Sequence, residues 1–214
     1  MTHTAQLVHV TPDAEHLVAY MARVSNPNNQ NNTETAPNLI RYLIKHKHWS
    51  PFEMVSLCVE INTTRSISAQ ILRHRSFSFQ EFSQRYAEAP GAPVIPHFRT
   101  QDTRNRQASH DTLDSSLQAA FQGRALNLFS ESFQLYKDMV DAGVAKETAR
   151  DVLPLSTPTR LYMHGTIRSW IHYLDLRAEE GTQLEHQKIA KAIKAIFAEE
   201  LPDIYNAVWP KYVM

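Results

Sequence analysis

The segment 54–64 constrains the fold more than any other stretch of the chain, because its residues alternate well between two faces. One face of this segment carries Val55, Leu57, Val59 and Ile61, and the other carries Ser56, Cys58, Glu60 and Asn62. A period of two is typical of a strand whose side chains point alternately to the two sides of a sheet. The pattern therefore predicts a strand with one buried face.

The rest of the chain contains few further strands and many helices. Residues 4–10 are expected to form a short strand, and residues 159–167 either a strand or the start of a helix. Helical spacing is found over residues 65–74, about 37–47, about 111–142, 145–152, 168–179 and 183–200. Because strands and helices do not alternate regularly, the pattern favours an α+β fold over a doubly wound parallel sheet.

Capping residues predict where several helices begin and end. Thr11 is expected to cap a helix that has Pro12 at its first position, and Pro202 is expected to open a last short helix. Gly143 should end the long helix. That helix carries a series of apolar residues at helical spacing, which predicts a core or subunit interface rather than a cofactor site: Phe121, Leu126, Leu128, Phe129, Phe133 and Tyr136.

Two segments have no helical or strand pattern. The proline-rich run 89–98 cannot form regular structure, because proline lacks an N–H donor and has a fixed φ. The polar run 99–111 is expected to be a solvated loop or a mobile cover over a site.

Composition excludes several classes of protein. The 22 lysine and arginine residues balance 22 aspartate and glutamate residues, which argues against a general nucleic-acid-binding protein. The single cysteine, Cys58, excludes an internal disulfide framework and a cysteine-based zinc cluster. Neither a secretory signal nor an apolar run of about 20 residues is found, so a cytoplasmic protein without a membrane partner is expected. We expect residues 1–214 to form one domain.

The chemistry is concentrated in residues 73–86, RHRSFSFQEFSQRY. Three guanidiniums in so short a run repel one another unless anions lie between them. A guanidinium binds phosphate oxygens through two N–H donors, and neighbouring hydroxyls add further donors. The run therefore predicts a phosphate or nucleotide site, although a solvated surface turn explains the arginines equally well. Interleaved aromatic residues also leave open an RNA-binding module without catalysis.

The order of the residues resembles one known family. Arg73-His74-Arg75, followed by seven residues and Ser83, is similar to the Arg-His-Arg-x7-Ser motif of the flavin-dependent thymidylate synthases. Further matching segments are His48-Trp-Ser50-Pro51-Phe52-Glu53, Gln70, Ala149-Arg150-Asp-Val-Leu153-Pro154, Arg168-Ser-Trp and Leu176-Arg177-Ala178. Together these segments cover about residues 48–200.

The resemblance implies an enzyme that methylates dUMP to dTMP. It implies FAD as cofactor, reduced by NADPH, with 5,10-methylenetetrahydrofolate as carbon donor. FAD would be bound without a Rossmann motif, and the five glycines of the chain form none. The resemblance also implies a central antiparallel sheet with packed helices, and a homotetramer with active sites shared between subunits.

Roles for individual residues follow from the resemblance alone. The expected FAD contacts are Ser50, Arg73, His74, Arg75, Glu81, Thr166, Arg168 and His172. The expected dUMP contacts are Gln70, Arg73, Glu81, Phe82, Ser83, Gln84, Arg85, Arg150 and Arg177. His48 and Tyr86 are expected near the folate. At Thr166 and His172 some members carry asparagine, and at Gly181 some carry histidine.

Arg177 is expected to be the catalytic residue, because a permanently charged guanidinium beside N3 of uracil favours the deprotonated ring. Cys58 has no basic neighbour in its strand that would lower its pKa, so packing is expected rather than nucleophilic attack. A metal site is not expected, since lysines flank the pair His46 and His48 and no His-Glu-x-x-His helix occurs.

Overall fold

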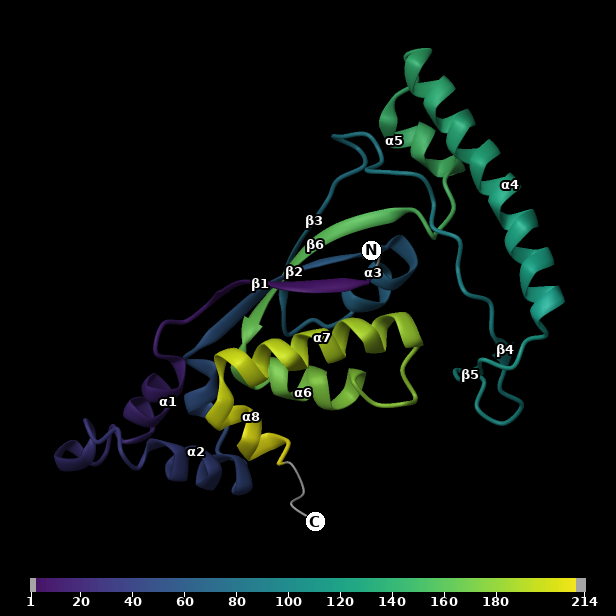
Figure 1. Cartoon of the computed structure of the whole chain (residues 1–214). Coiled ribbons are helices and arrows are strands. Elements are labelled where there is room, and N and C mark those ends of the chain that lie inside the picture. Colours follow the sequence, from purple (N-terminus) through teal and green to yellow (C-terminus); the bar gives the residue numbers. More distant parts are fainter. Residues whose placement is uncertain (1–2, 211–214) are drawn as a thin grey trace.

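The computed structural model describes residues 3–210 and has an α+β fold (Figure 1). Its main sheet has four strands: β1 (Thr4–Val10), β2 (Ser56–Thr64), β3 (Ser78–Glu81) and β6 (Pro158–Thr166). The strands lie in the order β1-β2-β6-β3, and every neighbouring pair is antiparallel. The α+β class and the antiparallel sheet expected from the sequence are therefore confirmed.

Most of the chain outside the sheet is helical. The α-helices are α1 (Ala14–Ala22), α2 (Ala36–Lys45), α3 (Arg65–Ile71), α4 (Ser115–Asp141), α5 (Lys146–Ala149), α6 (Ile167–Arg177), α7 (Leu184–Glu200) and α8 (Pro202–Val208). Three 3-10 helices are η1 (Pro27–Asn29), η2 (Ser50–Glu53) and η3 (Arg150–Val152). A second, two-stranded sheet pairs β4 (Thr100–Gln101) with β5 (Ser109–His110).

The alternation in residues 54–64 has its predicted effect. Leu57, Val59 and Ile61 are fully buried, and they lie beside the buried residues Leu161 and Met163 of β6. Helices α6 and α7 cover this face and complete the core. Trp170 of α6 is fully buried, and its indole N–H donates to the carbonyl of Leu57 at 2.9 Å. This bond fixes α6 against β2, near the end of the strand where Leu57 lies.

The pairing of β2 with β6 determines where two helices begin. Ser56 lies opposite Thr166, and Thr64 lies opposite Pro158. Helix α3 follows directly after Thr64, and α6 follows directly after Thr166. Because the strands are antiparallel and nine residues long, the two helices begin at opposite ends of the sheet, roughly 27 Å apart.

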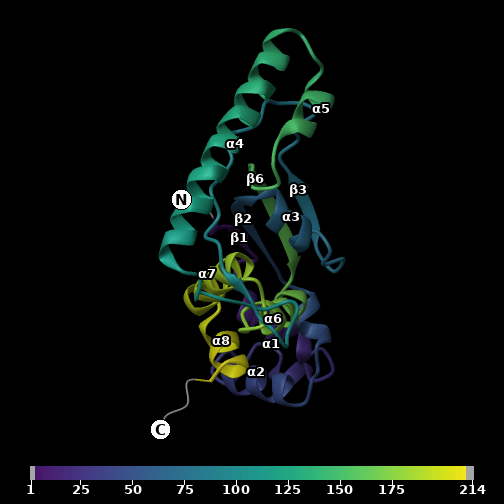
Figure 2. The ribbon, with the colours of Figure 1, turned by 90° about the vertical axis from the view of Figure 1, so that its right-hand side faces the viewer.

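Helix α4 differs from the others, because only Tyr136 among its 27 residues is buried. Its N-terminus is capped by Asp114, whose carboxylate accepts from the amides of Ser116 and Leu117. After the helix, Gly143 has the positive φ of 86° that its predicted role as terminator requires. In both views α4 and α5 lie at the end of the molecule away from α1, α2 and α8 (Figures 1 and 2).

Two local predictions, the cap at Thr11 and the loop over residues 99–111, were wrong, and strand β3 was not predicted. Helix α1 begins at Ala14, because the hydroxyl of Thr11 instead accepts from the amide of Ser56 at 2.9 Å and ties the chain to β2. Residues 78–81, inside the basic run, form strand β3 on the edge of the sheet. The run 99–111 contains the short hairpin of β4 and β5 rather than a plain loop. No helix within residues 3–210 is both long and apolar enough to cross a membrane.

Candidate active site

Many of the residues singled out by the sequence, together with the side chains that contact them, form three groups in the folded chain. The α6 N-terminal cluster comprises Trp49, Ser50, Glu53, Thr166, Arg168 and His172. The α6 C-terminal cluster comprises His74, Tyr173, Arg177 and His186. The β3–α5 cluster comprises Arg65, Glu81, Gln84, Arg85, Glu147 and Arg150.

In the α6 N-terminal cluster, helix α6 meets the 3-10 helix η2. The hydroxyl of Thr166 caps α6 by accepting from the amide of Ser169 at 3.2 Å. Arg168 forms an ion pair with Glu53 of η2. The ring of His172 lies against Trp49 with 4.9 Å between ring centroids. These contacts place Arg168 and His172, one helical turn apart, beside the exposed Ser50.

In the α6 C-terminal cluster, Arg177 holds the ring of His74. The Nε–H of Arg177 donates to Nε2 of His74 at 2.9 Å. This ring nitrogen must therefore be unprotonated, and a neutral His74 carries its proton on Nδ1. Burial, followed by the charges of Arg177 and Arg73, lowers the pKa of His74 to about 4. At neutral pH His74 is thus an uncharged ring with one remaining N–H donor.

The geometry of α6 separates its two arginines. Arg168 and Arg177 are nine residues apart, which corresponds to about 13 Å along the helix and about 180° around it. Arg168 pairs with η2, whereas Arg177 pairs with His74. The two guanidiniums therefore lie on opposite sides of α6 and have different partners.

In the β3–α5 cluster, Glu81 is held by three donors. Its Oε1 accepts from Ser68 Oγ at 2.7 Å, from Thr159 Oγ1 at 3.0 Å and from Arg65 Nη1 at 3.3 Å. These donors come from α3 and β6. Glu81 is therefore fixed by its own chain, and its Arg65 contact connects it to the neighbouring cavity.

That cavity, of about 330 Å³, collects polar donors from distant parts of the chain. It is lined by Arg65, Gln84, Arg150, Asp151, Leu153, Pro154, Leu155 and Thr157. Gln84 is 4% exposed, and its buried Nε2 has no hydrogen-bond partner within the described chain. A buried donor without an acceptor costs about 1–3 kcal/mol, so this amide is suited to binding a ligand oxygen.

Glu147 brings two of the predicted nucleotide-binding arginines together. Its carboxylate accepts from Nε and Nη2 of Arg85 at 3.2 and 3.1 Å, and its carbonyl accepts from Nε of Arg150 at 3.2 Å. Gln84, Arg85 and Arg150 thus gather at one end of the molecule. Two guanidiniums and an amide form a donor set that suits a phosphate group.

Other predicted residues lie apart from these contacts. Arg73, Arg75 and Ser83 are exposed, and Tyr86 is 89% exposed. His48 is exposed, with its ring 5.9 Å from that of Tyr42. Phe82 lines a separate cavity of about 460 Å³ beside Arg160. In a single chain these side chains, apart from the partly buried Phe82, are therefore open to solvent.

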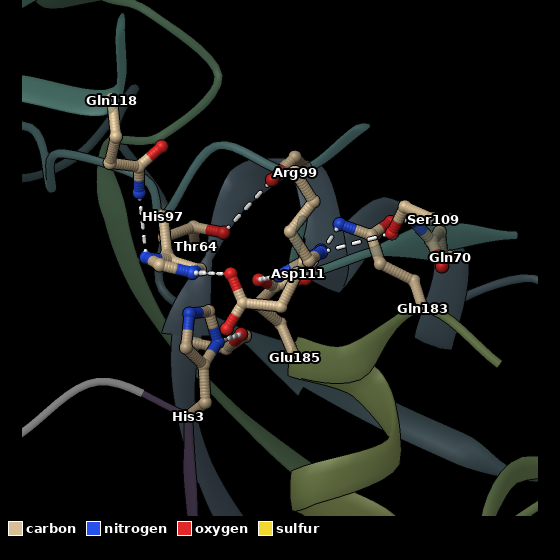
Figure 3. A network of polar contacts seen from close by, with 12 residues as sticks. His3, Thr64, Gln70, His97, Arg99, Ser109, Asp111, Gln118, Gln183 and Glu185 are labelled. Atoms are coloured by element: carbon tan, nitrogen blue, oxygen red, sulfur yellow. Dashed lines mark hydrogen bonds and ion pairs between the residues drawn. The ribbon is translucent and has the colours of Figure 1, made fainter. Parts of the chain in front are cut away.

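The Arg99–Glu185 clasp ties the extended segment 89–111 to α7 (Figure 3). The guanidinium of Arg99 donates to both carboxylate oxygens of Glu185, at 2.7 and 2.9 Å, and both side chains are less than one fifth exposed. Gln183 bonds to Glu185 and also accepts from Gln70, at 2.9 and 2.7 Å. Gln70, a predicted dUMP contact, is thus connected to the clasp.

Electrostatics at Glu185 reflect this pairing. Burial alone would raise the pKa of its carboxyl group. The hydrogen bonds from Arg99, from its own backbone amide and from Gln183, together with the Arg99 charge, outweigh burial and lower this pKa to about 2. The clasp is therefore charged throughout the neutral pH range.

Phe77 packs the loop that carries His74 against helix α6. Phe77 lies at 4.7 Å from Trp170 and at 5.6 Å from Tyr173, measured between ring centroids. Its ring also covers Gly165 of β6, where an added Cβ would lie 2.4 Å from the Phe77 ring. Only glycine fits at this position while the ring is in place.

Cys58 lies in β2 outside all three clusters. It is 8% exposed, and burial raises the pKa of its thiol. A raised pKa keeps the sulfur protonated, which disfavours nucleophilic attack. Within residues 3–210, no three histidine, cysteine, aspartate or glutamate side chains lie close enough together to hold a metal ion.

The sequence did not single out several residues that complete the clusters. Tyr173 and His186 lie at helical spacing among apolar residues and therefore resemble core positions. Arg65, Ser68 and Thr159 become partners of Glu81 only through the folding of α3 and β6. Glu53 was part of the matching segment 48–53, but no role was assigned to it from the sequence.

Comparisons with known proteins agree with the motifs. Residues 6–203 match the family described as thymidylate synthase complementing protein. A relative from Paramecium bursaria Chlorella virus 1, described as a probable flavin-dependent thymidylate synthase, is 50% identical over 205 residues, covering 96% of this chain and 95% of that protein. A flavin-dependent thymidylate synthase from Synechocystis is 48% identical over 194 residues, covering 91% and 89%.

A solved structure has the same fold. The UMP/dUMP methylase PolB from Streptomyces cacaoi, bound with 5-Br dUMP, superposes with a TM-score of 0.83 at 28% sequence identity. The superposition covers 95% of this chain and 93% of that chain.

Proposed function

The chain belongs to the thymidylate synthase complementing protein family, and on this premise we propose that it is a flavin-dependent thymidylate synthase. The substrate is dUMP, the product is dTMP, the carbon donor is 5,10-methylenetetrahydrofolate, and NADPH reduces FAD. The observation that carries this proposal is the pairing of Arg177 with a neutral His74, because it presents a fixed positive charge beside an uncharged donor.

The polar groups of the chain fit FAD. Its phosphates and ring carbonyls are acceptors, and the α6 N-terminal cluster together with the basic run supplies donors on different elements. We assign the cofactor contacts to Ser50, Arg73, His74, Arg75, Glu81, Thr166, Arg168 and His172. Bound and reduced, FAD supplies the hydride that completes the methyl group. The neutral state of His74 matters here, because a neutral ring donates a hydrogen bond without adding a third positive charge between two arginines.

We assign the nucleotide to the β3–α5 cluster and its cavity. Gln84, Arg85 and Arg150 donate to the phosphate, and Ser83 adds a hydroxyl. The unpartnered amide of Gln84 supports this assignment, since an acceptor from dUMP would satisfy it. The related methylase PolB was solved with 5-Br dUMP, a close analogue of this substrate.

Arg177 activates the pyrimidine. A guanidinium near N3 stabilises the deprotonated ring, and the added electron density makes C5 a better nucleophile toward the methylene of the folate. No thiol is needed for this route, and the raised pKa of Cys58 agrees with a thiol that stays protonated. His48 and Tyr86 are assigned to the folate region.

We further propose that the chain is one domain that assembles as a homotetramer with shared sites. Two observations support sharing. Arg168 and Arg177 lie on opposite faces of α6, and α4 leaves large apolar side chains uncovered, with Leu128 62% exposed. An assembled site could collect the three clusters from different subunits.

Product formation tests the proposal directly. Purified protein is incubated with dUMP, methylenetetrahydrofolate, NADPH and FAD, and dTMP is measured with each component omitted in turn. We expect dTMP only in the complete mixture, and a yellow protein whose colour bleaches on reduction by NADPH. A colourless protein that takes up no added FAD, or dTMP formation that persists without FAD, contradicts the proposal.

A further inference from the structure

A buried polar pair lies directly behind the Arg177–His74 contact. The hydroxyl of Tyr173 lies 2.9 Å from Nε2 of His186, and the two residues are 2% and 0% exposed. The other ring nitrogen of His186, Nδ1, has no partner within the described chain. Because neither residue reaches the surface, the pair can affect the site only through the residues packed against it.

Both members of the pair are uncharged at neutral pH. Burial, followed by the charges of Arg177 and His74, lowers the pKa of His186 to about 4, and burial raises the pKa of Tyr173 above its ordinary value. Whichever of the two residues donates, they share one hydrogen bond. That bond is the only one formed by either side chain within residues 3–210.

The position of Tyr173 explains why this bond matters. Its ring meets the ring of His74 edge to face, with 4.8 Å between centroids. It also lies four residues before Arg177 on α6, and residues at this spacing are neighbours on one helical face. Without His186, the Tyr173 hydroxyl would be buried and unpaired. Arg177 and His74 are the polar residues next to Tyr173, so the hydroxyl would compete for their hydrogen bond.

We propose that His186 is a positioning residue, which binds the Tyr173 hydroxyl and thereby leaves His74 Nε2 and Arg177 paired with each other. The inference rests on the proposed function, because Arg177 must be held in one orientation to act on the pyrimidine. His186 touches neither substrate nor cofactor in this scheme. It removes a competing hydroxyl from the site.

The scheme predicts a specific pattern in a double-mutant cycle. His186→Leu releases the hydroxyl and should lower kcat about 10-fold, within the roughly 10²-fold that a misplacement of about 1 Å can cost, and by a larger factor than it changes KM for dUMP or FAD content. Tyr173→Phe lacks the hydroxyl and should keep kcat within about threefold. Tyr173→Phe/His186→Leu should return to the rate of Tyr173→Phe. His186→Gln, which can still bond to the hydroxyl, should rescue most of the rate.

A second readout needs no turnover. In protein with ¹⁵N-labelled histidine, the ring signals of His74 should identify Nδ1 as protonated and Nε2 as an acceptor. His186→Leu should shift the Nε2 signal, and the double variant should restore it. This measurement separates the two hypotheses, because wild type that forms no dTMP disproves the proposed function, whereas the His74 signals still test the role of His186.

Several outcomes would overturn the inference. One is a His186→Leu variant with wild-type kcat and an unshifted His74 signal. Another is a double variant as slow as His186→Leu although its thermal midpoint is restored, which indicates a purely structural role for His186. If His186→Leu fails to fold, the His74 ring signals are measured in Tyr173→Phe instead. The inference requires these signals to be unchanged, and shifted signals would overturn it.

Discussion

Helices α6 and α4 show how differently two parts of one chain are stabilised. Helix α6 has 11 residues, of which five are buried, and it is bonded to the sheet through Trp170. Helix α4 has 27 residues and buries only Tyr136. Its N-cap and its glycine terminator support the helix locally, but its packing against this chain is slight.

The difference in burial leads us to expect different roles for the core and the α4 region. Arg168, His172 and Arg177 project from α6, whose backbone is fixed by burial, so these candidate site residues are attached to a rigid element. The exposed leucines of α4 instead leave an apolar surface of the kind found at interfaces. Changes on α6 should therefore alter chemistry or unfolding, and changes on α4 should alter association.

The largest effect is expected from Arg177→Ala. Loss of the guanidinium should lower dTMP formation by about 10²–10³-fold, the range found when one group that stabilises a transition state is removed. FAD content and the thermal midpoint should change little, because Arg177 lies at the end of α6. Arg41→Ala, an exposed arginine of α2, is the matched control and should retain full turnover. Equal losses of dTMP formation in Arg177→Ala and Arg41→Ala would contradict a specific role for Arg177.

Trp170→Ala should have the largest effect on folding. Removing this fully buried ring should reduce the free energy of unfolding by about 3–5 kcal/mol, measured by denaturant titration. Leu128→Ala on α4 should change it by less than about 1 kcal/mol in the dissociated chain. Leu128→Glu should instead lower the molar mass measured by sedimentation. A Leu128→Ala variant as unstable as Trp170→Ala would remove the distinction between the two helices.

The Arg99–Glu185 clasp connects the segment leading to α4 with the core, and an intermediate effect is expected there. Arg99→Gln should cost on the order of 2 kcal/mol of stability, because it leaves a mostly buried carboxylate without its cation. The exposed Arg106→Gln serves as control and should be neutral.

The pH dependence of this effect follows from Glu185, whose pKa is lowered to about 2 from the ordinary value of 4.5. Because the folded-state value is depressed, the stabilisation is complete above pH 4.5 and is lost as the pH falls toward 2. The difference in free energy of unfolding between wild type and Arg99→Gln should therefore decrease as the pH falls from 4.5 toward 2. A difference in stability that stays constant with pH would show that loss of the Arg99–Glu185 pair does not cause it.

Cys58→Ala should have the smallest effect. The thiol is packed in β2 away from the three clusters, so dTMP formation should remain within about twofold of wild type while stability falls by about 1 kcal/mol. A folded but inactive variant would reopen attack by a thiolate. Turnover and the unfolding midpoint are both measured.

Local pattern was sufficient for much of the fold. The alternation in residues 54–64 predicted β2 and its buried face, and Gly143 predicted the end of α4, because both depend on neighbours in sequence. Strand β3 was missed because its four residues, Ser78–Glu81, lie in a run of arginines and serines, and only pairing with β6 makes them a strand. Thr11 was misassigned because a tertiary bond to Ser56 replaces its capping role.

The sequence named candidate site residues, but it did not predict how they are arranged. The motif picked out His74 and Arg177, yet the direction of their hydrogen bond, and with it the tautomer of His74, depends on contacts across 103 residues. Tyr173 and His186 could not be recognised from the sequence. Each lies at a position of its own helix where the spacing predicts an ordinary core residue, and only the packing of α6 against α7 brings the two together. Separation of Arg168 from Arg177 follows from helix geometry once the bounds of α6 are known.

The contact between Gly165 and Phe77 has a consequence for how such chains diverge. Any side chain at position 165 collides with the ring, and a smaller residue at position 77 leaves a void beside Trp170. Neither position can therefore change first without harm, although a paired replacement by a small β-branched residue and a slimmer partner could succeed. Descendants of this chain should keep both residues or exchange both together.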